Sequence, residues 1–208
     1  MISSSRETLS EQSEDPLKDS ARLKIVSKWE KTLSTEHCKT INVDLIKNKI
    51  WCPTLGPKCF IYETPYYGRT VVAGEPITKG TKLYNCIGEI YDHPTTYTVQ
   101  VDDNKHINSI QGTCEYTCAS CDPNCYFKLE DDVLTLVALR DIEKGEQITF
   151  NYCTTEFIMS TPFNCLCGAK NCLGYVAGFS NLPEKHRKEL FPICLPHIQK
   201  RALEEGLI

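Results

Sequence analysis

The chain has 208 residues, of which 41% are hydrophobic and 24% charged, which fits one globular domain with flanking segments. No apolar run is long enough to span a membrane, and the polar N-terminus lacks the apolar core of a secretory signal. We therefore expect an intracellular protein of the cytoplasm or nucleus. The net charge is −4, from 23 basic and 27 acidic residues without a basic stripe, which argues against direct nucleic-acid binding.

The first part of the chain divides into two predicted segments. Residues 1–20 hold six serines, five acidic residues and only four apolar residues, a composition that predicts disorder. In residues 21–57 a helical N-terminal flank is expected after an N-cap at Ser20. Its apolar stripe, at a spacing of four, consists of Ile25, Trp29 and Leu33.

Residues 58–156 predict a mainly β domain, because short runs of β-branched and aromatic residues alternate with Gly and Pro. The run at 133–139 is apolar on both faces and should be a central strand, preceded by a turn at Asp131 and Asp132. His106 is expected in a solvated turn. The expected strands cover 59–63, 69–73, 81–87, 97–102, 133–139 and 147–152. Residues 179–208 predict a helical tail, with breaks at Pro192 and Pro196.

Two segments of this β domain resemble each other. VVAGEPITKGTKL at 71–83 and LVALRDIEKGEQI at 136–148 share five identical positions at an offset of 65 residues. Both predict a strand, a Lys-Gly turn and a second strand, since glycine supplies the positive φ that such a turn needs.

Cysteine is over-represented, with 13 residues, and an odd number without an export signal favours a metal site in a reducing compartment over disulfides. Six of them form two tight clusters: Cys118, Cys121 and Cys125, then Cys165, Cys167 and Cys172. Zinc takes four ligands, and the second cluster can supply three. The fourth is predicted to be Cys121, with Cys118, Cys125 and Cys153 as alternatives.

Such a closed four-cysteine site would be structural, because no ligand position is left for chemistry. It would staple residues 157–178 onto the β domain and convert metal binding into folding free energy. Cys52 and Cys59, which have six residues between them, match no metal pattern and are predicted to be ordinary core residues.

Four motifs in order carry a family resemblance: YGRTVVAGEPITKGTKLYNCIGEI, SCDPNC, GEQITFNY and CLCGAKNCLG. Residues 58–176 thus resemble a SET domain followed by a post-SET zinc hook, a family of S-adenosylmethionine (SAM)-dependent protein-lysine methyltransferases. The short middle segment is similar to the short-form SET proteins of microbes and fungi. The resemblance implies small twisted sheets around a pseudoknot, with the strand 147–152 threaded near SCDPNC.

The resemblance also implies roles for individual residues. Tyr152 would lie in the active site, and zinc would be held by Cys165, Cys167, Cys172 and Cys121. The implied SAM contacts come from Gly68, Arg69, Thr70, Tyr116, Cys118, Ala119 and Leu166. Three parts of the family pattern are changed: its second glycine is Thr70, its Asn-His pair is Cys118-Ala119, and its arginine is Glu115. Because lost polar contacts weaken binding, these changes predict a reduced affinity for SAM.

Three functions follow from these observations. The first is a SAM-dependent lysine methyltransferase acting on a protein. The second is a non-methylating SET scaffold that binds a protein partner, which the changed cofactor positions favour. The third is a SET fold recruited to a small-molecule reaction, which the short middle segment favours. The first is the preferred reading, and the sequence does not indicate an oligomeric state.

Overall fold

The computed structural model describes residues 41, 43–46, 49–64, 68–109 and 113–208, and the account below concerns these residues. The segment predicted to be disordered and the apolar stripe around Trp29 lie outside them. The described part of 41–57 is not an α-helix: it contains a 3-10 turn, η1 (Val43–Leu45), and a short strand, β1 (Ile50–Trp51). Pairing of Ile50 and Trp51 with the next strand explains this difference.

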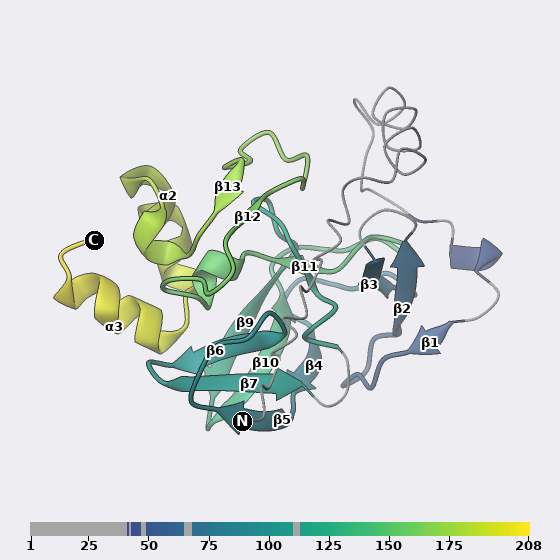
Figure 1. Ribbon diagram of the computed structural model, residues 1–208. Helices are drawn as coiled ribbons and strands as arrows, with labels where there is room; N and C mark the ends of the chain where they lie inside the picture. The colour runs from purple at the N-terminus through teal and green to yellow at the C-terminus, as the bar shows by residue number, and fades with distance from the viewer. Residues whose placement is uncertain (1–40, 42, 47–48, 65–67, 110–112) are drawn as a thin grey trace, which may run out of the picture. The chain divides into compact units, whose positions relative to one another are not determined.

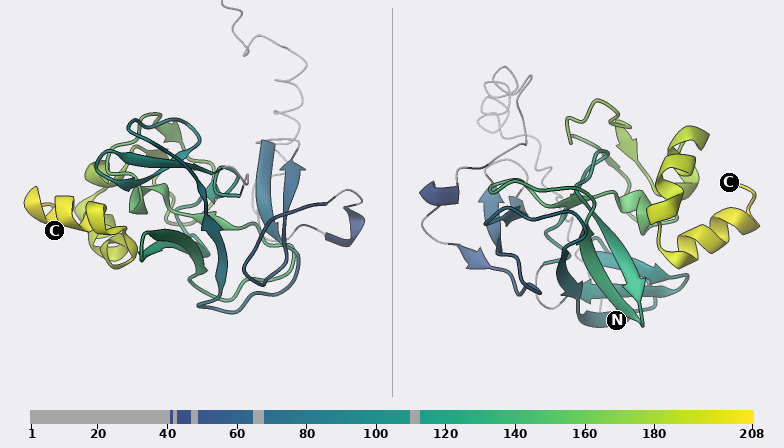
Figure 2. Two further views of the ribbon diagram at one scale, coloured as in Figure 1. Left: turned by 90° about the horizontal axis from the view of Figure 1, so that it is seen from below. Right: turned by 180° about the vertical axis from the view of Figure 1, so that it is seen from behind.

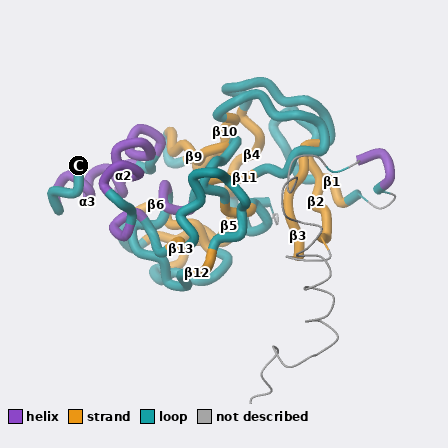
Figure 3. Tube along the Cα trace, turned by 90° about the horizontal axis from the view of Figure 1, so that it is seen from above, coloured by secondary structure: helices purple, strands orange, loops and turns teal. Residues whose placement is uncertain are grey.

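The first sheet has the strand order β1-β2-β3, with β2 spanning Cys59–Thr64 and β3 spanning Gly68–Ala73 (Figure 3). Successive residues of β3 bury on opposite faces, as the two-residue period of a strand requires. Val71 and Ala73 join the main core, whereas Val72 packs with Phe60 and Val43 in a second, smaller cluster. This sheet therefore connects the N-terminal turn η1 to the main core.

The second sheet consists of β4 (Lys82–Cys86), β9 (Cys125–Glu130) and β10 (Val133–Ala138), in the order β4-β10-β9 (Figure 1). The prediction of a central strand near 133–139 is confirmed. The predicted turn is also found, since Asp131 and Asp132 connect β9 to β10 with φ values of 49° and 62°. Aspartate tolerates this left-handed conformation better than most residues do.

In the third sheet, β5 (Gly88–Tyr91) and β6 (Thr98–Asp102) both pair with β7 (Lys105–Ser109). β6 matches the strand predicted at 97–102, whereas β5 and β7 were not predicted from the sequence. The prediction that His106 lies in a solvated turn is wrong: it is buried in β7, where burial lowers its pKa. Its place on the middle strand, opposite Tyr91 and Gln100, excludes water from both sides.

The two similar segments pair with each other. Ile77 and Ile142 exchange N–H···O bonds of 2.9 and 2.8 Å. Each turn glycine donates its N–H to the alanine that ends the strand of the other segment: Gly80 to Ala138 at 2.9 Å, and Gly145 to Ala73 at 2.7 Å. Both glycines have positive φ, 81° and 87°, as predicted. The repeat thus forms a nearly symmetric junction between the first two sheets.

The predicted crossing of the chain is present. β8 (Cys118–Ala119) and β11 (Thr149–Phe150) form a two-stranded parallel ladder, and Ser120 donates its N–H to the Phe150 carbonyl at 3.0 Å. The strand predicted over 147–152 is shorter than expected. It ends at Phe150, and the next residue, Asn151, caps the 3-10 helix η2 (Tyr152–Thr154) by accepting the Cys153 N–H with its side chain.

Residues 163–208 form a short two-stranded ladder followed by a helical tail. β12 (Phe163–Asn164) pairs with β13 (Tyr175–Val176). The tail then contains η3 (Phe179–Asn181), α2 (Glu184–Leu190), η4 (Phe191–Ile193) and α3 (Pro196–Glu204). α2 and α3 lie together at the C-terminal end of the chain (Figure 2). Among the described residues, no helix is long and apolar enough to cross a membrane.

Glu156 joins β6 to the segment that follows η2. It is only 9% exposed, and its Oε1 accepts the Gln100 N–H at 2.8 Å. In return, the Gln100 side-chain oxygen accepts the Phe157 N–H at 3.2 Å. Burial raises the pKa of Glu156 from 4.5 to about 7, because a charged carboxylate is poorly solvated there.

The two turn glycines provide a matched test of the repeat. A Cβ at Gly80 would meet no atom within 4 Å, whereas at Gly145 it would lie 2.2 Å from the Ile41 carbonyl oxygen. Gly80→Ala should cost about 1 kcal/mol for its positive φ. Gly145→Ala should cost at least ~1 kcal/mol more, for the steric clash. Urea denaturation of both variants measures the difference, and equal costs would contradict it.

Glu156 should make the free energy of unfolding depend on pH. Between pH 4.5 and about 7 the folded protein holds a proton that the unfolded chain has lost, so this contribution declines as the pH rises. Glu156→Gln keeps an acceptor for Gln100 but does not titrate. From pH 5 to pH 8 the variant should therefore gain up to about 3 kcal/mol relative to the wild type. Denaturant titrations at both pH values test this, and parallel stabilities would refute it.

Candidate functional site

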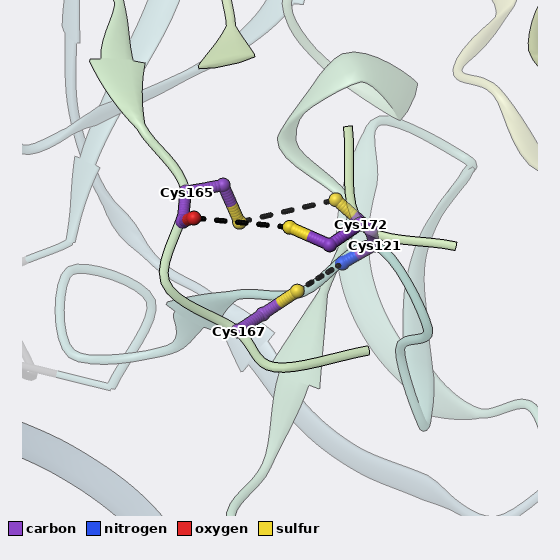
Figure 4. Close-up of side chains that lie close together, drawn as sticks. All are labelled: Cys121, Cys165, Cys167 and Cys172. Atoms are coloured by element: carbon purple, nitrogen blue, oxygen red, sulfur yellow. Dashed lines mark hydrogen bonds between the residues drawn. The ribbon is translucent and has the colours of Figure 1, made fainter. Parts of the chain in front are cut away.

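Four cysteine side chains meet at one point beside the β8–β11 crossing. The Sγ atoms of Cys121, Cys165, Cys167 and Cys172 all lie within 4.8 Å of one another (Figure 4). The sulfurs of Cys121 and Cys165 are 3.8 Å apart. A tetrahedral zinc ion with Zn–S bonds of about 2.3 Å separates its sulfur ligands by roughly 3.8 Å. The donor set and its spacing therefore fit a zinc ion.

The backbone positions these four residues from two distant segments. Cys121 follows β8 directly, whereas the other three lie in the loop between β12 and β13. The Cys165 N–H donates to the Gly174 carbonyl at 2.8 Å and closes that loop at its base. Gly168, with φ of +68°, makes a bend between Cys167 and Cys172.

Backbone amides point at two of the sulfurs. The Cys121 N–H lies 3.5 Å from Cys167 Sγ, and the Leu173 N–H lies 3.4 Å from Cys121 Sγ. Burial opposes ionisation of Cys167, but hydrogen bonds from the Cys121 and Ala169 amides outweigh it and lower the pKa to about 7. Such donors stabilise a thiolate, which is the form that binds metal.

The three alternative fourth ligands lie elsewhere. Cys118 lies in β8, and its Sγ is 3.4 Å from Thr70 Oγ1. Cys125 is buried at the start of β9, and Cys153 is buried in η2. Among the described residues, only Cys121 joins the second cysteine cluster within 4.8 Å. Cys52 and Cys59 are core residues, and burial raises the pKa of each to about 12.

Tyr152 lies at the start of η2, within a group of aromatic rings. Its ring centroid is 4.6 Å from that of Phe150 and 6.0 Å from that of Phe163. Its hydroxyl donates to the Thr117 carbonyl at 2.9 Å. Burial, with a contribution from nearby Cys118, raises the pKa of the Tyr152 phenol well above its ordinary value. Tyr152 is therefore a neutral hydroxyl at physiological pH.

Thr117 connects Tyr152 to the core. Its side chain forms a short hydrogen bond with the Tyr84 hydroxyl and donates to the Thr113 carbonyl at 2.8 Å. Both Tyr84 and Thr117 are fully buried. The position of the Tyr152 hydroxyl is thereby fixed through one backbone carbonyl that the core itself holds.

Most of the residues predicted to contact cofactor are brought together at the start of β3. The Val71 N–H donates to the Tyr116 carbonyl at 3.1 Å, which places residues 68–70 beside 116–119. Arg69 donates to the Tyr116 hydroxyl at 3.2 Å, and its guanidinium lies 5.5 Å from that ring's centroid. Gly68, with φ of +78°, begins the strand, and Ala119 pairs with Phe150.

Thr70, which stands where the family pattern has its second glycine, is fully buried and hydrogen-bonded. Thr70 Oγ1 accepts from Gln147 Nε2 at 2.7 Å and lies 3.4 Å from Cys118 Sγ. Thr70, Gln147 and Cys118 therefore satisfy one another's polar atoms in the region where the sequence predicted weakened cofactor contacts.

Leu166 differs from the other predicted cofactor residues. It lies between two cysteines of the cluster and is 92% exposed. The four-cysteine cluster attaches its loop to the residues that follow β8, but no hydrogen bond joins Leu166 to residues 68–70. Its role in binding a cofactor stays a prediction.

Several residues of this region were not found from the sequence. Each acts through a hydrogen bond to a residue far away in the chain. The separations are 35 positions for Thr117, 77 for Gln147 and 56 for Glu156. No local pattern marks such partners. The signal available for this region was the threading of 147–152 near SCDPNC that the family resemblance implies, and β8 does pair with β11.

Comparison with known proteins identifies the domain. Residues 68–153 match the model of the SET domain family. The chain is 35% identical over 88 residues to methyltransferase flvH of Aspergillus flavus, covering 42% of this chain and 49% of that protein. It is 25% identical over 152 residues to an H3 lysine-36 specific histone-lysine N-methyltransferase of Mycosarcoma maydis, covering 63% of this chain and 16% of that protein.

The fold has a counterpart among solved structures. KRYPTONITE, in complex with mCHH DNA, an H3(1–15) peptide and SAH, superposes with a TM-score of 0.51 at 20% identity, covering 58% of this chain and 30% of that one. The chain thus spans about half the length of flvH and a much smaller share of the histone methyltransferase of Mycosarcoma maydis. The matched residues contain β3, the β8–β11 crossing and Tyr152. Residues 68–153 of this chain are therefore a SET domain.

Proposed function

We propose that the chain is a SAM-dependent methyltransferase whose acceptor is an amine, with the side chain of a protein lysine as the preferred substrate. The observation that supports this most directly is the neutral hydroxyl of the partly buried Tyr152, held by the Thr117 carbonyl next to residues 68–70 and 116–119. The relatives named as methyltransferases match the same part of the chain.

The proposed methyl-donor site is formed by Gly68, Arg69, Thr70, Tyr116, Cys118, Ala119 and Leu166. When bound there, SAM would supply a methyl group on a positively charged sulfur. The chain's part is to orient the acceptor and keep water away, because alignment of reacting atoms accounts for much of such a barrier. Gly68 leaves space at the start of β3, since a Cβ there would meet nothing within 4 Å.

Tyr152 would orient the amine. Its proton is donated to the Thr117 carbonyl, so the phenol oxygen keeps its lone pairs to accept an N–H from the acceptor. An amine must be neutral to act as a nucleophile, whereas a free lysine has a pKa of about 10.4. Desolvation beside the rings of Phe150 and Phe163, which pack on Tyr152, would lower the pKa of a lysine bound there. With its own raised pKa, Tyr152 is not the base.

The non-methylating scaffold is disfavoured by the intact Tyr152 region. A small-molecule acceptor stays the second candidate, because the relative flvH is named only a methyltransferase and no histone substrate is part of its name. The two acceptor classes differ in a direct assay. Labelled SAM is offered to purified protein with either a protein extract that includes histone H3 or a mixture of free amines and amino acids.

We further propose that Cys121, Cys165, Cys167 and Cys172 hold a structural zinc ion, which would make residues 157–178 a post-SET hook. The support is the cluster geometry and the backbone N–H groups aimed at its sulfurs. The ion would hold the loop that carries Leu166 close to the residues after β8. The domain boundaries at residues 58, 156 and 178 are part of the same proposal.

Removing the tyrosine hydroxyl should abolish amine orientation without changing methyl-donor binding. Tyr152→Phe should bind SAM with a dissociation constant within about twofold of the wild type, since its ring packing is retained. The transfer rate should fall at least about tenfold for the loss of one hydrogen bond. Titration calorimetry and label transfer measure the two. No SAM binding by the wild type up to millimolar concentration would exclude the proposed activity.

Zinc content should depend on the four clustered cysteines alone. The purified wild type should contain about one zinc per chain, and Cys172→Ser should lose it, because a hydroxyl is a poor replacement for a thiolate ligand. Cys194→Ser is the matched control: Cys194 is buried outside the cluster and donates to the Leu190 carbonyl, a bond that serine retains. Elemental analysis decides, and a metal-free wild type or zinc retained in Cys172→Ser would contradict the assignment.

A further inference from the structure

The segment from Tyr152 to Phe157, here called the Tyr152 turn, leaves its last carbonyl groups without partners inside the turn. Within it, the Thr155 and Glu156 N–H groups both donate to the Tyr152 carbonyl, at 3.1 and 2.9 Å. The carbonyls of the following residues point out of the turn, as at the end of any short helix. Something outside the turn must satisfy them, because it is buried.

Four consecutive carbonyls of the Tyr152 turn accept hydrogen bonds from the tail that follows β13. The carbonyls of Glu156 and Phe157 accept the N–H groups of Phe179 and Ser180, at 2.9 and 3.1 Å. The carbonyl of Thr154 accepts the Leu195 N–H at 2.9 Å. The remaining carbonyl, that of Thr155, lies 3.0 Å from His197 Nε2.

Three of these four bonds have backbone N–H donors, and the fourth is made by the side chain of His197. The chemistry of the two atoms shows which one is the donor. A carbonyl oxygen only accepts, so Nε2 carries the proton and the ring is the neutral Nε2–H tautomer. Burial lowers the pKa of His197, which keeps the ring neutral at physiological pH. The ring is only 6% exposed, and Nδ1 has no protein partner among the described residues.

A second contact from α3 reaches the end of the turn. The Arg201 guanidinium lies 4.0 Å from the centroid of the Phe157 ring, one helical turn after His197. α3 also runs beside β6 (Figure 1), and Gln100 of β6 makes its paired bonds to Glu156 and Phe157. The Tyr152 turn is thus held from two directions, by β6 and by the C-terminal tail.

We infer that four residues of the tail, Phe179, Ser180, Leu195 and His197, complete the active site by capping the Tyr152 turn, and that His197 is a positioning residue for Tyr152. Among the described residues, no hydrogen bond joins this tail to a predicted cofactor residue, or to Phe150 or Phe163 beside Tyr152. Its effect on catalysis must therefore act through the backbone of the turn. That catalytic effect rests on the proposed function, whereas the capping itself does not.

The test uses the full chain and three variants. His197→Leu removes the donor to Thr155, and His197→Gln replaces it with an amide nitrogen of similar reach. Gln199→Leu is the matched control, because Gln199 Nε2 donates to the Phe191 carbonyl at 2.8 Å, within the tail and away from the turn. Hydrogen–deuterium exchange is measured at the amides of Thr155 and Glu156. For each protein, kcat and KM for SAM are measured as well.

In His197→Leu we expect exchange at these amides to quicken about tenfold, the effect of one lost hydrogen bond. The kcat should fall by a similar factor, with KM for SAM within about twofold, and His197→Gln should restore both. Gln199→Leu should leave exchange and kcat unchanged. If His197→Leu lowers the Tm sharply, His197→Asn replaces it, since the shorter amide does not reach Thr155.

Each outcome decides the inference. Unchanged exchange in His197→Leu would overturn it, whether or not the protein methylates anything. Equal effects from Gln199→Leu would also overturn it, because they would mean that the whole tail had loosened. If the wild type shows no methyl transfer, faster exchange in His197→Leu alone, reversed in His197→Gln, would support the capping while the proposed function fails separately.

Discussion

The side chain of Asn124 holds together the crossing on which the rest of the structure depends. Its amide nitrogen donates to the Gln147 carbonyl at 2.8 Å and to Glu146 Oε1 at 3.2 Å, while its oxygen accepts the Thr149 N–H at 2.9 Å. An amide is the one side chain of this size that can both donate and accept in this way. These bonds fix residues 146–149 against the loop after β8, and from there Tyr152 and Cys121 take their positions.

The sequence predicted the elements whose partners are close or whose residue types are distinctive. β10 was recognisable because its residues are apolar on both faces of the strand, and the paired turns at Gly80 and Gly145 from their repeated Lys-Gly pattern. The sequence analysis preferred Cys121 as the fourth ligand, and Cys121 is the residue that lies with Cys165, Cys167 and Cys172 in the cluster. Metal sites are easier to predict than most sites, because ligand type and spacing restrict them strongly.

What was missed depends on long-range packing. β7 has a polar sequence, because four of its five residues are Lys105, His106, Asn108 and Ser109, yet it pairs with β5 on one side and β6 on the other. Close approach at Gly88 makes this possible, since a Cβ there would lie 1.7 Å from the Asn108 carbonyl oxygen. Neither His106 nor Glu156 carries a local signal of burial, because each is enclosed by segments far away in the chain.

The capping of the Tyr152 turn by the tail has a consequence for biosynthesis. Because the chain is synthesised from its N-terminus, β8 can pair with β11 as soon as Phe150 is available. The four cysteines can come together once Cys172 has been made. The last carbonyl partners of the turn are supplied by Leu195 and His197. On a growing chain the turn therefore stays incompletely bonded until the start of α3 has been synthesised, and Tyr152 acquires its final position only then.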